Sequence, residues 1–454
     1  MTSENAKTLD VIGVGLGPFN LSLAALLHPL TDIEAMFFES RDQFDWHPGL
    51  MMEDCTLQVP MMADLTTMAD PTSEFTYLNY LHRTGRLYNF YFYEEFLIPR
   101  SDYNRYCQWS AEQMHSLRFS HTVTAIKANG EGYQVVVRDN TSQLETIYQA
   151  RHVVLGTGSV PAIPEGIQHL KGNANCIHSA AYLQRRAELQ ASNSITVIGA
   201  GQSAAEIVLD LLDEQPQHGY EINWLTRGDG FLPMEYSKLG LEHFSPDYID
   251  YFHQLPEATR DSIRKGQDLW YKGISDFTIG EIYNRIYRRS IGNKPVPITL
   301  QARSELLNAM AEGDGLRLAF EHRDQQQAFE VTTDKLVLAT GHRHPIPDCL
   351  SSMLDYFEKD SQQRLVINRD YTVASKVPLA GNLYVQNGEL HSHGIGAPDL
   401  GLGAYRSAAI ANQLIGRDHY VIRNKNVFQN FGVAEKWQGS SSRDESKAPE
   451  LLSA

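Results

Sequence analysis

Cysteine is scarce in this sequence and never occurs in pairs. The 454 residues contain four cysteines, at positions 55, 107, 176 and 349, and no two of them form a C-x-x-C pair. Single, scattered cysteines are typical of a reducing compartment, where they are ordinary buried or surface thiols. We therefore expect a cytoplasmic protein.

Basic residues are also few relative to acidic ones. Lys and Arg number 39 against 55 Asp and Glu, which gives a formal net charge of -16 at pH 7. Such a chain is repelled by nucleic acid and by anionic membranes, so neither is an expected partner. Residues 11–30 carry no charge, but they contain several glycines and Pro18 and no basic segment precedes them. They do not fit a signal anchor, and we expect no membrane association.

The rest of the composition is that of an ordinary globular protein. Hydrophobic residues make up 42% and charged residues 21% of the chain, values usual for soluble domains. A chain of 454 residues is long enough for two or three domains, each with its own core.

The first informative motif is a glycine-rich turn near the start of the chain. A mainly apolar run from Leu9 to Val14 contains Gly13. Gly15, Gly17 and Pro18 follow it, and then a second apolar segment. This order predicts a strand, a tight turn and a helix whose exposed N–H groups hold a pyrophosphate. Proline is tolerated at position 18 because the first helical turn needs no N–H there.

An acidic residue stands where a dinucleotide fold needs one. The apolar run 34–38 predicts a second strand, and Glu39 follows it directly. An acid at the end of this strand binds a ribose hydroxyl in dinucleotide-binding folds. Glu39 is therefore a candidate cofactor-binding residue, together with the glycines of the turn.

The same order of strand, glycine-rich turn and helix recurs in the middle of the chain. The run from Ile195 to Ile198 leads into Gly199, Gly201, Gln202 and Ser203, which predicts a second dinucleotide turn. Its partner strand, residues 222–225, ends not in an acid but in Thr226 and Arg227. A cation there suits a 2′-phosphate, so NADPH is favoured over NADH.

Two further strands end in a similar way. Residues 153–155 lead into Gly156-Thr157-Gly158, and residues 335–338 lead into Ala339-Thr340-Gly341. A buried strand that ends in such a sequence is typical of the point at which the chain passes out of a nucleotide-binding domain. We therefore include Thr340 and Gly341 among the cofactor-binding candidates. Two H-x-H pairs, at 342/344 and 391/393, lack a recognised ligand spacing, so we expect no metal.

Taken together, these motifs resemble the microbial N-hydroxylating flavin monooxygenases of hydroxamate siderophore synthesis. The disulfide reductases, which share the two turns, need a cysteine pair that is absent here. The resemblance extends to about residue 430 and is carried, besides the glycine turns, by Phe44-Asp45-Trp46-His47-Pro48-Gly49, Leu57-Gln58-Val59, Asp64-Leu65, Ala339-Thr340-Gly341 and His393-Gly394-Ile395.

The resemblance implies an α/β fold with two Rossmann-like domains, for FAD and NADPH, and a small, mostly helical substrate domain. We assign residues 1–165 and 336–432 to the FAD domain and 166–230 and 300–335 to the NADPH domain. Residues 231–299 are the expected helical substrate region, and 433–454, rich in Gly, Ser and charge, a disordered tail. A homo-oligomer, dimer or tetramer, is also implied.

The family's mechanism has three parts. NADPH reduces FAD, reduced flavin and O2 give a C4a-hydroperoxide, and a neutral substrate amine attacks the distal oxygen to give a hydroxylamine and water. By resemblance, Gln58 and Trp46 are the catalytic candidates at the flavin ring. His47 is expected to bind cofactor, and Arg227 to bind the NADPH phosphate.

The substrate prediction depends on departures from the family. The lysine and ornithine hydroxylases that this sequence resembles have a substrate-binding lysine where Ala63 stands here. An unpaired buried carboxylate would cost several kcal/mol, so the substrate is expected to lack one. The other positions aligned with the family's substrate contacts or considered for an amine partner are Leu241, Glu242, Ser275, Asp276, Asn387 and Gly401.

We therefore expect a diamine N-monooxygenase for putrescine or cadaverine. Glu242 and Asp276 are the candidates for holding the distal ammonium group. L-Lysine or L-ornithine is the alternative substrate. A flavin redox sensor or an uncoupled NADPH oxidase is the alternative of a different class.

Overall fold

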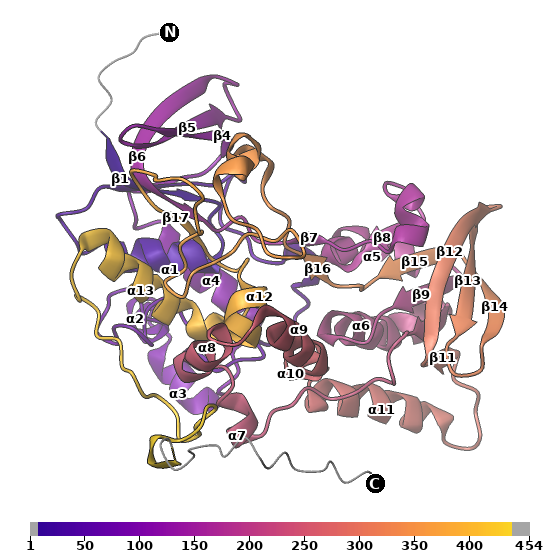
Figure 1. Cartoon of the computed structure of the whole chain (residues 1–454). Coiled ribbons are helices and arrows are strands. Elements are labelled where there is room, and N and C mark those ends of the chain that lie inside the picture. Colours follow the sequence, from indigo (N-terminus) through magenta and orange to yellow (C-terminus); the bar gives the residue numbers. More distant parts are fainter. Residues whose placement is uncertain (1–7, 438–454) are drawn as a thin grey trace, which may run out of the picture.

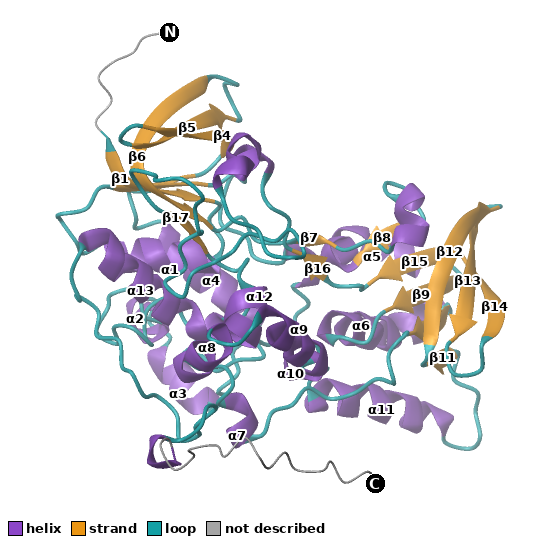
Figure 2. Ribbon diagram, viewed as in Figure 1, coloured by secondary structure: helices purple, strands orange, loops and turns teal. Residues whose placement is uncertain are grey.

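The structure, a computed structural model, describes residues 8–437. It has two α/β halves that lie side by side (Figure 1). Each half is built on a mainly parallel sheet with helices packed against it (Figure 2). The predicted class, α/β with two Rossmann-like domains, is confirmed.

The first half contains a seven-stranded sheet in the order β3-β2-β1-β6-β5-β4, with β17 paired to β6. Strands β3, β2, β1, β6 and β17 run parallel, whereas β4, β5 and the start of β6 form an antiparallel meander. The strands are β1 (Leu9–Val14), β2 (Ala35–Phe38), β3 (Leu117–Arg118), β4 (His121–Asn129), β5 (Gly132–Asp139), β6 (Glu145–Leu155) and β17 (Leu383–Val385).

One face of this sheet is covered by α1 and by helices that pack around it. All ten residues of α1 are buried, because its Leu- and Ala-rich sequence faces the sheet on one side and α13 on the other. The helices of this half are α1 (Pro18–Leu27), α2 (Tyr77–Arg83), α3 (Leu87–Tyr93), α4 (Arg100–Ala111), α12 (Leu390–His393) and α13 (Gly403–Ile415), with the 3-10 turns η1 (Pro48–Leu50), η4 (Asp348–Tyr356), η5 (Gly394–Gly396) and η6 (Leu400–Leu402).

The second half contains a five-stranded parallel sheet in the order β11-β10-β9-β15-β8. Helix α6 and its neighbours cover one face, and a three-stranded antiparallel sheet covers the other. The elements are β8 (Cys176–His178), α5 (Tyr182–Gln190), β9 (Ser194–Ile198), α6 (Gln202–His218), β10 (Glu221–Leu225), α11 (Asp276–Ser290), β11 (Ile298–Gln301), β12 (Ser304–Glu312), β13 (Gly315–His322), β14 (Gln327–Thr333) and β15 (Lys335–Leu338), with η2 (Glu165–Leu170) and η3 (Ser179–Ala181).

The borders between the halves differ from the predicted ones in two places. Strand β15 extends the second sheet to residue 338, so 336–338 do not belong to the first half. The predicted helical substrate region, 231–299, is not a separate body. Its helix α11 packs on α6 of the second half, whereas α8 (Pro246–His253) and α9 (Glu257–Gly266) pack on α12 of the first. The short helix α7 (Lys238–Leu241) precedes α8 in sequence, and the short helix α10 (Asp268–Tyr271) lies between α9 and α11.

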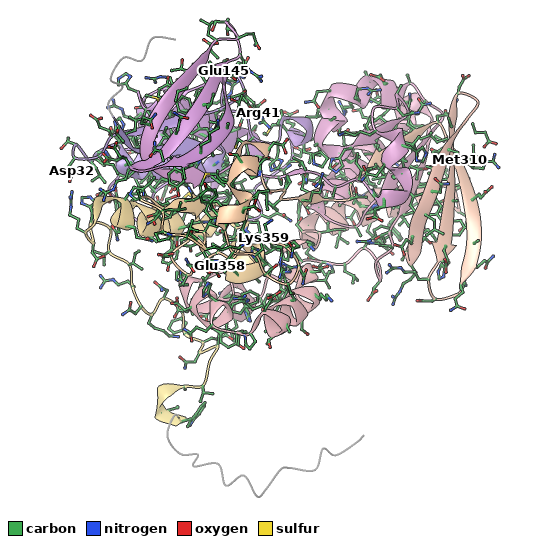
Figure 3. The ribbon with its side chains drawn as sticks, turned by 45° about the horizontal axis from the view of Figure 1, so that its top comes forward. Asp32, Arg41, Glu145, Met310, Glu358 and Lys359 are labelled. Carbon is green, nitrogen blue, oxygen red and sulfur yellow. The ribbon has the colours of Figure 1, made fainter. Side chains whose placement is uncertain are left out.

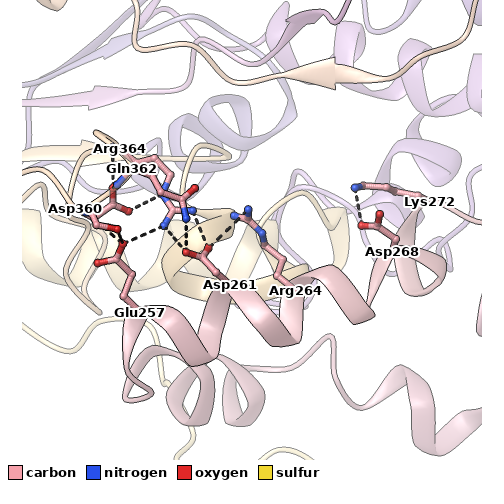
Figure 4. A network of polar contacts seen from close by, with 9 residues as sticks. Glu257, Asp261, Arg264, Asp268, Lys272, Asp360, Gln362 and Arg364 are labelled. Atoms are coloured by element: carbon pink, nitrogen blue, oxygen red, sulfur yellow. Dashed lines mark hydrogen bonds and ion pairs between the residues drawn. The ribbon is translucent and has the colours of Figure 1, made fainter. Parts of the chain in front are cut away.

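An ion-pair cluster holds α9 on the first half (Figure 4). Arg364 donates to Asp261 of α9 over 2.9 Å and lies 3.7 Å from Glu257. The same guanidinium is fixed by Asp360 on its own loop. Lys272, after α10, pairs with Asp268 over 2.7 Å. The contacts of Arg364 link α9, which has no fully buried residue, to the first half.

Two short strands connect the halves. β7 (Val160–Pro161) and β16 (His342–Arg343) pair antiparallel where the chain crosses from one half to the other and back. Of the predicted tail, 433–454, the structure describes only 433–437, with the turn η7 (Glu435–Trp437); the rest lies outside the described residues. Within residues 8–437, no helix has the length and apolar character to cross a membrane.

Candidate active site

A cavity of about 690 Å³ opens at the carboxyl ends of the first sheet's parallel strands. The first glycine turn, the loop after β2, the crossing segment after β6 and the loop before α13 form its wall. The predicted site residues that line it are Gly15, Gly17, Pro18, Glu39, Trp46, His47 and Asn387. The cavity therefore brings together residues from four distant parts of the sequence.

The first glycine turn forms one wall. Gly15 has φ +81°, and a Cβ there would lie 2.6 Å from the carbonyl oxygen of Gly156, so no other residue fits without a shift of backbone. Gly17 and Pro18 begin α1, as a phosphate-binding helix start requires. Gly13 instead lies inside β1, where a Cβ would collide with the Phe37 ring. Its role is strand packing and not the turn that we predicted.

Glu39 reaches back to this turn. One carboxylate oxygen accepts the N–H of Leu16 over 2.8 Å, and the other accepts the hydroxyl of Ser40 and the N–H of Arg41, each over 3.0 Å. The side chain is thus fixed on the cavity wall beside the glycine turn. This is the place from which a carboxylate can accept ribose hydroxyls.

Trp46 and His47, on the loop after β2, form another part of the cavity wall. The Trp46 ring lies between the rings of His47 and Tyr103, at centroid distances of 4.7 and 5.3 Å. Its N–H on the main chain donates to Asn104 over 2.9 Å. His47 adopts the left-handed conformation, with φ 52°, which turns the chain into η1 at the cavity edge.

Gln58 carries an unsatisfied polar atom. Its side-chain amide nitrogen is buried, and no group in residues 8–437 accepts a hydrogen bond from it. Buried polar groups are nearly always paired, so an orphaned donor points to an absent acceptor. The glycine cradle and the fixed Glu39 carboxylate fit a bound dinucleotide. Gln58 is not among the residues that line the cavity, and its unpaired donor is consistent with an acceptor on such a ligand.

The second glycine turn is built like the first, on the second sheet. Gly199 has φ +134°, and a Cβ there would lie 2.2 Å from the Ala339 carbonyl oxygen. Gly201 is the N-cap of α6, and Ser203 lies in its first turn. The Gln202 side chain, however, is fully engaged within the protein, with Glu206, Thr278 and the N–H of Ser275.

The remaining cofactor candidates lie at the ends of the second sheet's strands. Arg227 follows β10 and has a side chain that is 73% exposed, 3.9 Å from Glu305. An exposed cation held only by a loose surface pair is free to accept a phosphate. Thr340 and Gly341 follow β15, where the Thr340 hydroxyl donates to the Ala162 carbonyl and the Gly341 carbonyl bonds His178 over 3.0 Å. These two residues brace the crossing strands and do not line the cavity.

Ala63 and Gly401 meet next to a carboxylate. The point where a Gly401 side chain would begin lies 3.9 Å from the Ala63 Cβ and 2.7 Å from an Asp399 oxygen. Asp399 accepts the N–H of Gly401 over 2.6 Å and thereby caps η6. Pro398 and Leu400 line the cavity, whereas Ala63, Asp399 and Gly401 are not among its lining residues. In the described part of the chain, no Lys or Arg forms an ion pair with Asp399. Enclosure by the protein raises the pKa of Asp399 to about 6.

The other substrate candidates serve the protein's own structure. Glu242, after α7, accepts the N–H groups of Phe428 and Gln429 over 3.1 and 2.9 Å, and Leu241 is the last residue of α7. Ser275 caps α11 by accepting the N–H of Thr278. Asp276 is exposed in the first turn of that helix. Neither acid is joined to the Ala63–Gly401 site.

Several residues that line the cavity were not among the predicted site residues. Tyr271, from the end of α10, lines the cavity, and so do His342 and His344, of which His342 belongs to the crossing strand β16. The sequence signal for the two histidines was their position directly after Ala339-Thr340-Gly341. No group of three or more metal-ligating side chains lies close together in the part of the chain that is described. Asp399, beside Gly401, was not predicted either, because in sequence it resembles any acidic helix cap.

Comparison with known proteins agrees with this geometry. The model of the L-lysine 6-monooxygenase/L-ornithine 5-monooxygenase family matches residues 7–344. The chain belongs to this family. The resemblance predicted from the glycine turns and the Gln58 and Trp46 segments is thereby confirmed.

Individual relatives of the family cover nearly the whole chain. The putrescine N-hydroxylase of Shewanella oneidensis is 43% identical over 93% of this chain and 84% of its own length. The FAD-bound structure of DfoA, a cadaverine monooxygenase of Erwinia amylovora, is 37% identical with a TM-score of 0.90, over 94% of this chain and 99% of DfoA. The ornithine N-hydroxylase KtzI of Kutzneria sp. 744, solved with reduced FAD, NADP+ and L-ornithine, is 27% identical with a TM-score of 0.84, over 90% of this chain and 99% of KtzI.

Proposed function

We propose that this monooxygenase uses FAD, NADPH and O2 to N-hydroxylate one terminal amine of an aliphatic diamine, putrescine or cadaverine, for siderophore synthesis. The observation that carries the substrate class is the site around Ala63 and Gly401. It offers a carboxylate, Asp399, where the binding of an amino acid needs a cation.

The relatives support the same assignment. The family includes enzymes for lysine and ornithine, yet the Shewanella relative, at 43% identity, acts on putrescine and DfoA, at 37%, on cadaverine. The ornithine enzyme KtzI is more distant, at 27%. DfoA holds FAD, and KtzI holds reduced FAD with NADP+, which supports both cofactors for this chain.

The wall residues indicate how the cofactors are held. Gly15, Gly17 and the start of α1 bind the FAD pyrophosphate through main-chain N–H groups, and Glu39 accepts a ribose hydroxyl. The orphaned Gln58 amide donates to the flavin ring. Arg227 binds the 2′-phosphate of NADPH at the end of the second sheet. When bound, FAD supplies the activation of O2, for which NADPH provides the two electrons.

The protein's contribution to the amine is electrostatic. Asp399 pairs with the distal ammonium group and thereby fixes which end of the diamine points into the cavity. The reacting amine lies among Trp46 and other ring and apolar groups, and this low-dielectric wall favours its neutral form. Only the neutral amine has the electron pair that forms the new N–O bond. Exclusion of water by the same wall favours oxygen transfer over peroxide release.

A substrate screen tests this function directly. The purified holoenzyme is given NADPH and putrescine, cadaverine, L-ornithine or L-lysine, and hydroxylamine product is compared with NADPH consumed. We expect near-equal amounts with the two diamines and little product with the amino acids. Product from L-lysine or L-ornithine at the diamine rate would overturn the substrate class. NADPH consumption that yields only peroxide with every amine would show an uncoupled oxidase instead.

We further propose that the enzyme is a homo-oligomer, in the cytoplasm, where its four free cysteines suit the reducing conditions. The proposed contact is α3, which has no buried residue although five of its seven residues are aromatic. Tyr88, Tyr91 and Phe92 are 78%, 70% and 74% exposed, and a hollow of about 830 Å³ lies beside them. Exposed aromatic patches of this kind are typical of protein interfaces.

Sedimentation velocity tests this contact. Phe92→Asp places a charge in the aromatic patch and is expected to lower the sedimentation coefficient to that of a monomer. The matched control is Met310→Asp, since Met310 (Figure 3) is 50% exposed on β12, which lies far from α3 in Figure 1. A monomeric wild type, or an oligomer that both variants retain, would contradict the proposal.

A further inference from the structure

A buried ion pair crosses the junction between the two halves. Arg100, the first residue of α4, belongs to the first half, and Glu206 lies in α6 of the second half. The guanidinium donates to both carboxylate oxygens, over 2.8 and 3.1 Å. The two side chains are only 10% and 5% exposed. A bidentate pair enclosed in this way has a fixed geometry, unlike an exposed pair.

On the second half, hydrogen bonds connect the ion pair to the second glycine turn. Gln202, the first residue of α6, donates to Glu206 over 2.9 Å and accepts the N–H of Ser275 over 2.8 Å. Its amide nitrogen also reaches Thr278 over 3.1 Å. The start of α6 and the start of α11 are thus joined to Arg100 by one chain of hydrogen bonds. The N–H groups at this start of α6 are those that a nucleotide pyrophosphate would meet.

On the first half, the same arginine holds a wall of the cavity. Arg100 donates to the Leu50 carbonyl over 2.7 Å, and Leu50 lines the cavity. The neighbouring Gly49 lies against the backbone of Ala180 in the second half, where a Cβ would be 1.9 Å from the carbonyl oxygen. The turn η1 is therefore pressed against η3, and Arg100 fixes it there.

We propose that Arg100, Glu206 and Gln202 form a latch that holds the nucleotide turn of α6 in register with the flavin cavity. They are positioning residues: the ion pair sets the distance between the two cofactor sites, and no member donates a proton to the reaction. Opening the latch separates the halves at η1 and misplaces the nicotinamide nucleotide relative to the flavin. This inference rests on the proposed use of FAD and NADPH.

Cys55 is a built-in reporter of the latch. It is buried, with 7% exposure, and packs with Leu50 among apolar side chains of the second half such as Tyr182. Burial first, and then the Glu206 carboxylate, raise the pKa of its thiol to about 12, against an opposing effect of the Arg100 guanidinium. Separation of the halves exposes this thiol. Its rate of labelling, read by peptide mass mapping on the holoenzyme without NADPH, measures opening independently of activity.

The decisive comparison is between Arg100→Gln and Glu206→Gln. If the latch holds the halves together, both variants label Cys55 at least about tenfold faster than the wild type. If only local charge matters, the two variants shift the rate in opposite directions, because Glu206 raises the thiol pKa and Arg100 lowers it. Cys107, buried in the core of the first half, is the internal standard for general unfolding.

Flavin reduction gives the functional readout. In anaerobic stopped flow without amine, both variants are expected to be reduced by NADPH at least about tenfold more slowly, with unchanged bound FAD. Arg100→Lys keeps the charge but not the bidentate fork, and is expected to recover part of the rate. The matched control is Arg285→Gln, which breaks the Arg285–Asp213 pair between α11 and α6 inside the second half and is expected to change neither reading.

Two results would overturn the latch: Cys55 labelling that is unchanged or shifts oppositely in the two variants, or wild-type reduction rates in both. A variant that fails to fold is recognised by fast Cys107 labelling, and Arg100→Lys then carries the comparison. If the wild type is not reduced by NADPH at all, the proposed function fails, while the labelling of Cys55 still decides whether the latch exists.

Discussion

Asp399→Asn is expected to lower kcat/KM for putrescine and cadaverine by a factor of about 100 or more. Removing one partner of an enclosed charge pair costs about 2–5 kcal/mol, which corresponds to roughly 30-fold to several thousand-fold in the rate constant. Asparagine keeps an oxygen that accepts the Gly401 N–H, so the turn before α13 is retained. Steady-state kinetics of hydroxylamine formation measures the effect, which should appear mainly as a raised KM.

The pH dependence supplies a second signature of the same carboxylate. The pKa of Asp399 is raised to about 6, so the group is mostly ionised at pH 7 and becomes neutral as the pH falls through about 6. Binding of a diamine needs the ionised form. The wild-type kcat/KM should therefore decline below about pH 6 more steeply than that of Asp399→Asn, and the ratio of the two profiles isolates this group from the titration of the substrate.

The controls are the two acids that the sequence analysis favoured. Glu242→Gln and Asp276→Asn remove carboxylates that cap main-chain N–H groups or face solvent, and each is expected to leave kcat/KM for diamines within about threefold. NADPH-dependent flavin reduction without amine should be unchanged in Asp399→Asn. A large loss in Glu242→Gln or Asp276→Asn, with normal activity of Asp399→Asn, would refute this assignment.

The two nucleotide domains could be predicted because their sequence signals are local. A branched apolar run that ends in glycines forms a strand and a helix start whatever surrounds it, since the positive φ of Gly15 and Gly199 is required by the turn itself. The same holds for Glu39, which has a fixed spacing from the first turn. Motifs of this kind carry both fold and cofactor class in a few consecutive residues.

The borders and the substrate contacts could not be predicted in this way. Helix α11 packs on the second half and buries Thr278 and Ile282 there. The sequence of α11 does not show which half it packs against. Asp276 and Asp399 look alike in sequence, as acids near a helix start. Tertiary packing alone makes one exposed and places the other beside Ala63.

Gln202 shows how a motif can mislead about a role. Its place in the second glycine turn predicted a cofactor contact, and the N–H groups of that turn are suitably placed for one. The side chain, however, has both of its ends bonded within the protein, to Glu206 and to Ser275. A spacing motif specifies backbone geometry well, whereas the partners of a side chain depend on which distant segment packs there.

The second large effect is expected on stability, from Arg406→Met. Arg406, on α13, pairs with Glu389, and the two side chains are 2% and 0% exposed. The guanidinium also donates to the Ala397 carbonyl over 2.8 Å and lies 4.4 Å from the centre of the Phe19 ring. Removing the cation leaves Glu389 as an uncompensated buried charge, which costs about 3–5 kcal/mol. A clear loss of thermal stability is expected, measured by circular dichroism.

The sign of the pH dependence follows from the burial of Glu389. Burial already raises the pKa of this carboxyl, and the loss of Arg406 raises it further above the unfolded value. A carboxyl whose folded pKa is raised binds more protons in the folded state, so its contribution to stability falls as pH rises through that window. The loss of stability caused by Arg406→Met should therefore be smaller at pH 5 than at pH 8.

Two further variants separate this explanation from a general loss of packing. Arg406→Met combined with Glu389→Leu removes both charges and should recover most of the stability, because a buried pair replaced by apolar groups is often neutral. Arg417→Met breaks a pair with Asp32 in which the two side chains are 51% and 49% exposed; Asp32 is labelled in Figure 3. This variant should change the unfolding free energy by no more than about 1 kcal/mol. If the double variant were as unstable as Arg406→Met, packing of the guanidinium on Phe19 and Ala397, and not its charge, would hold the loop that carries Asp399.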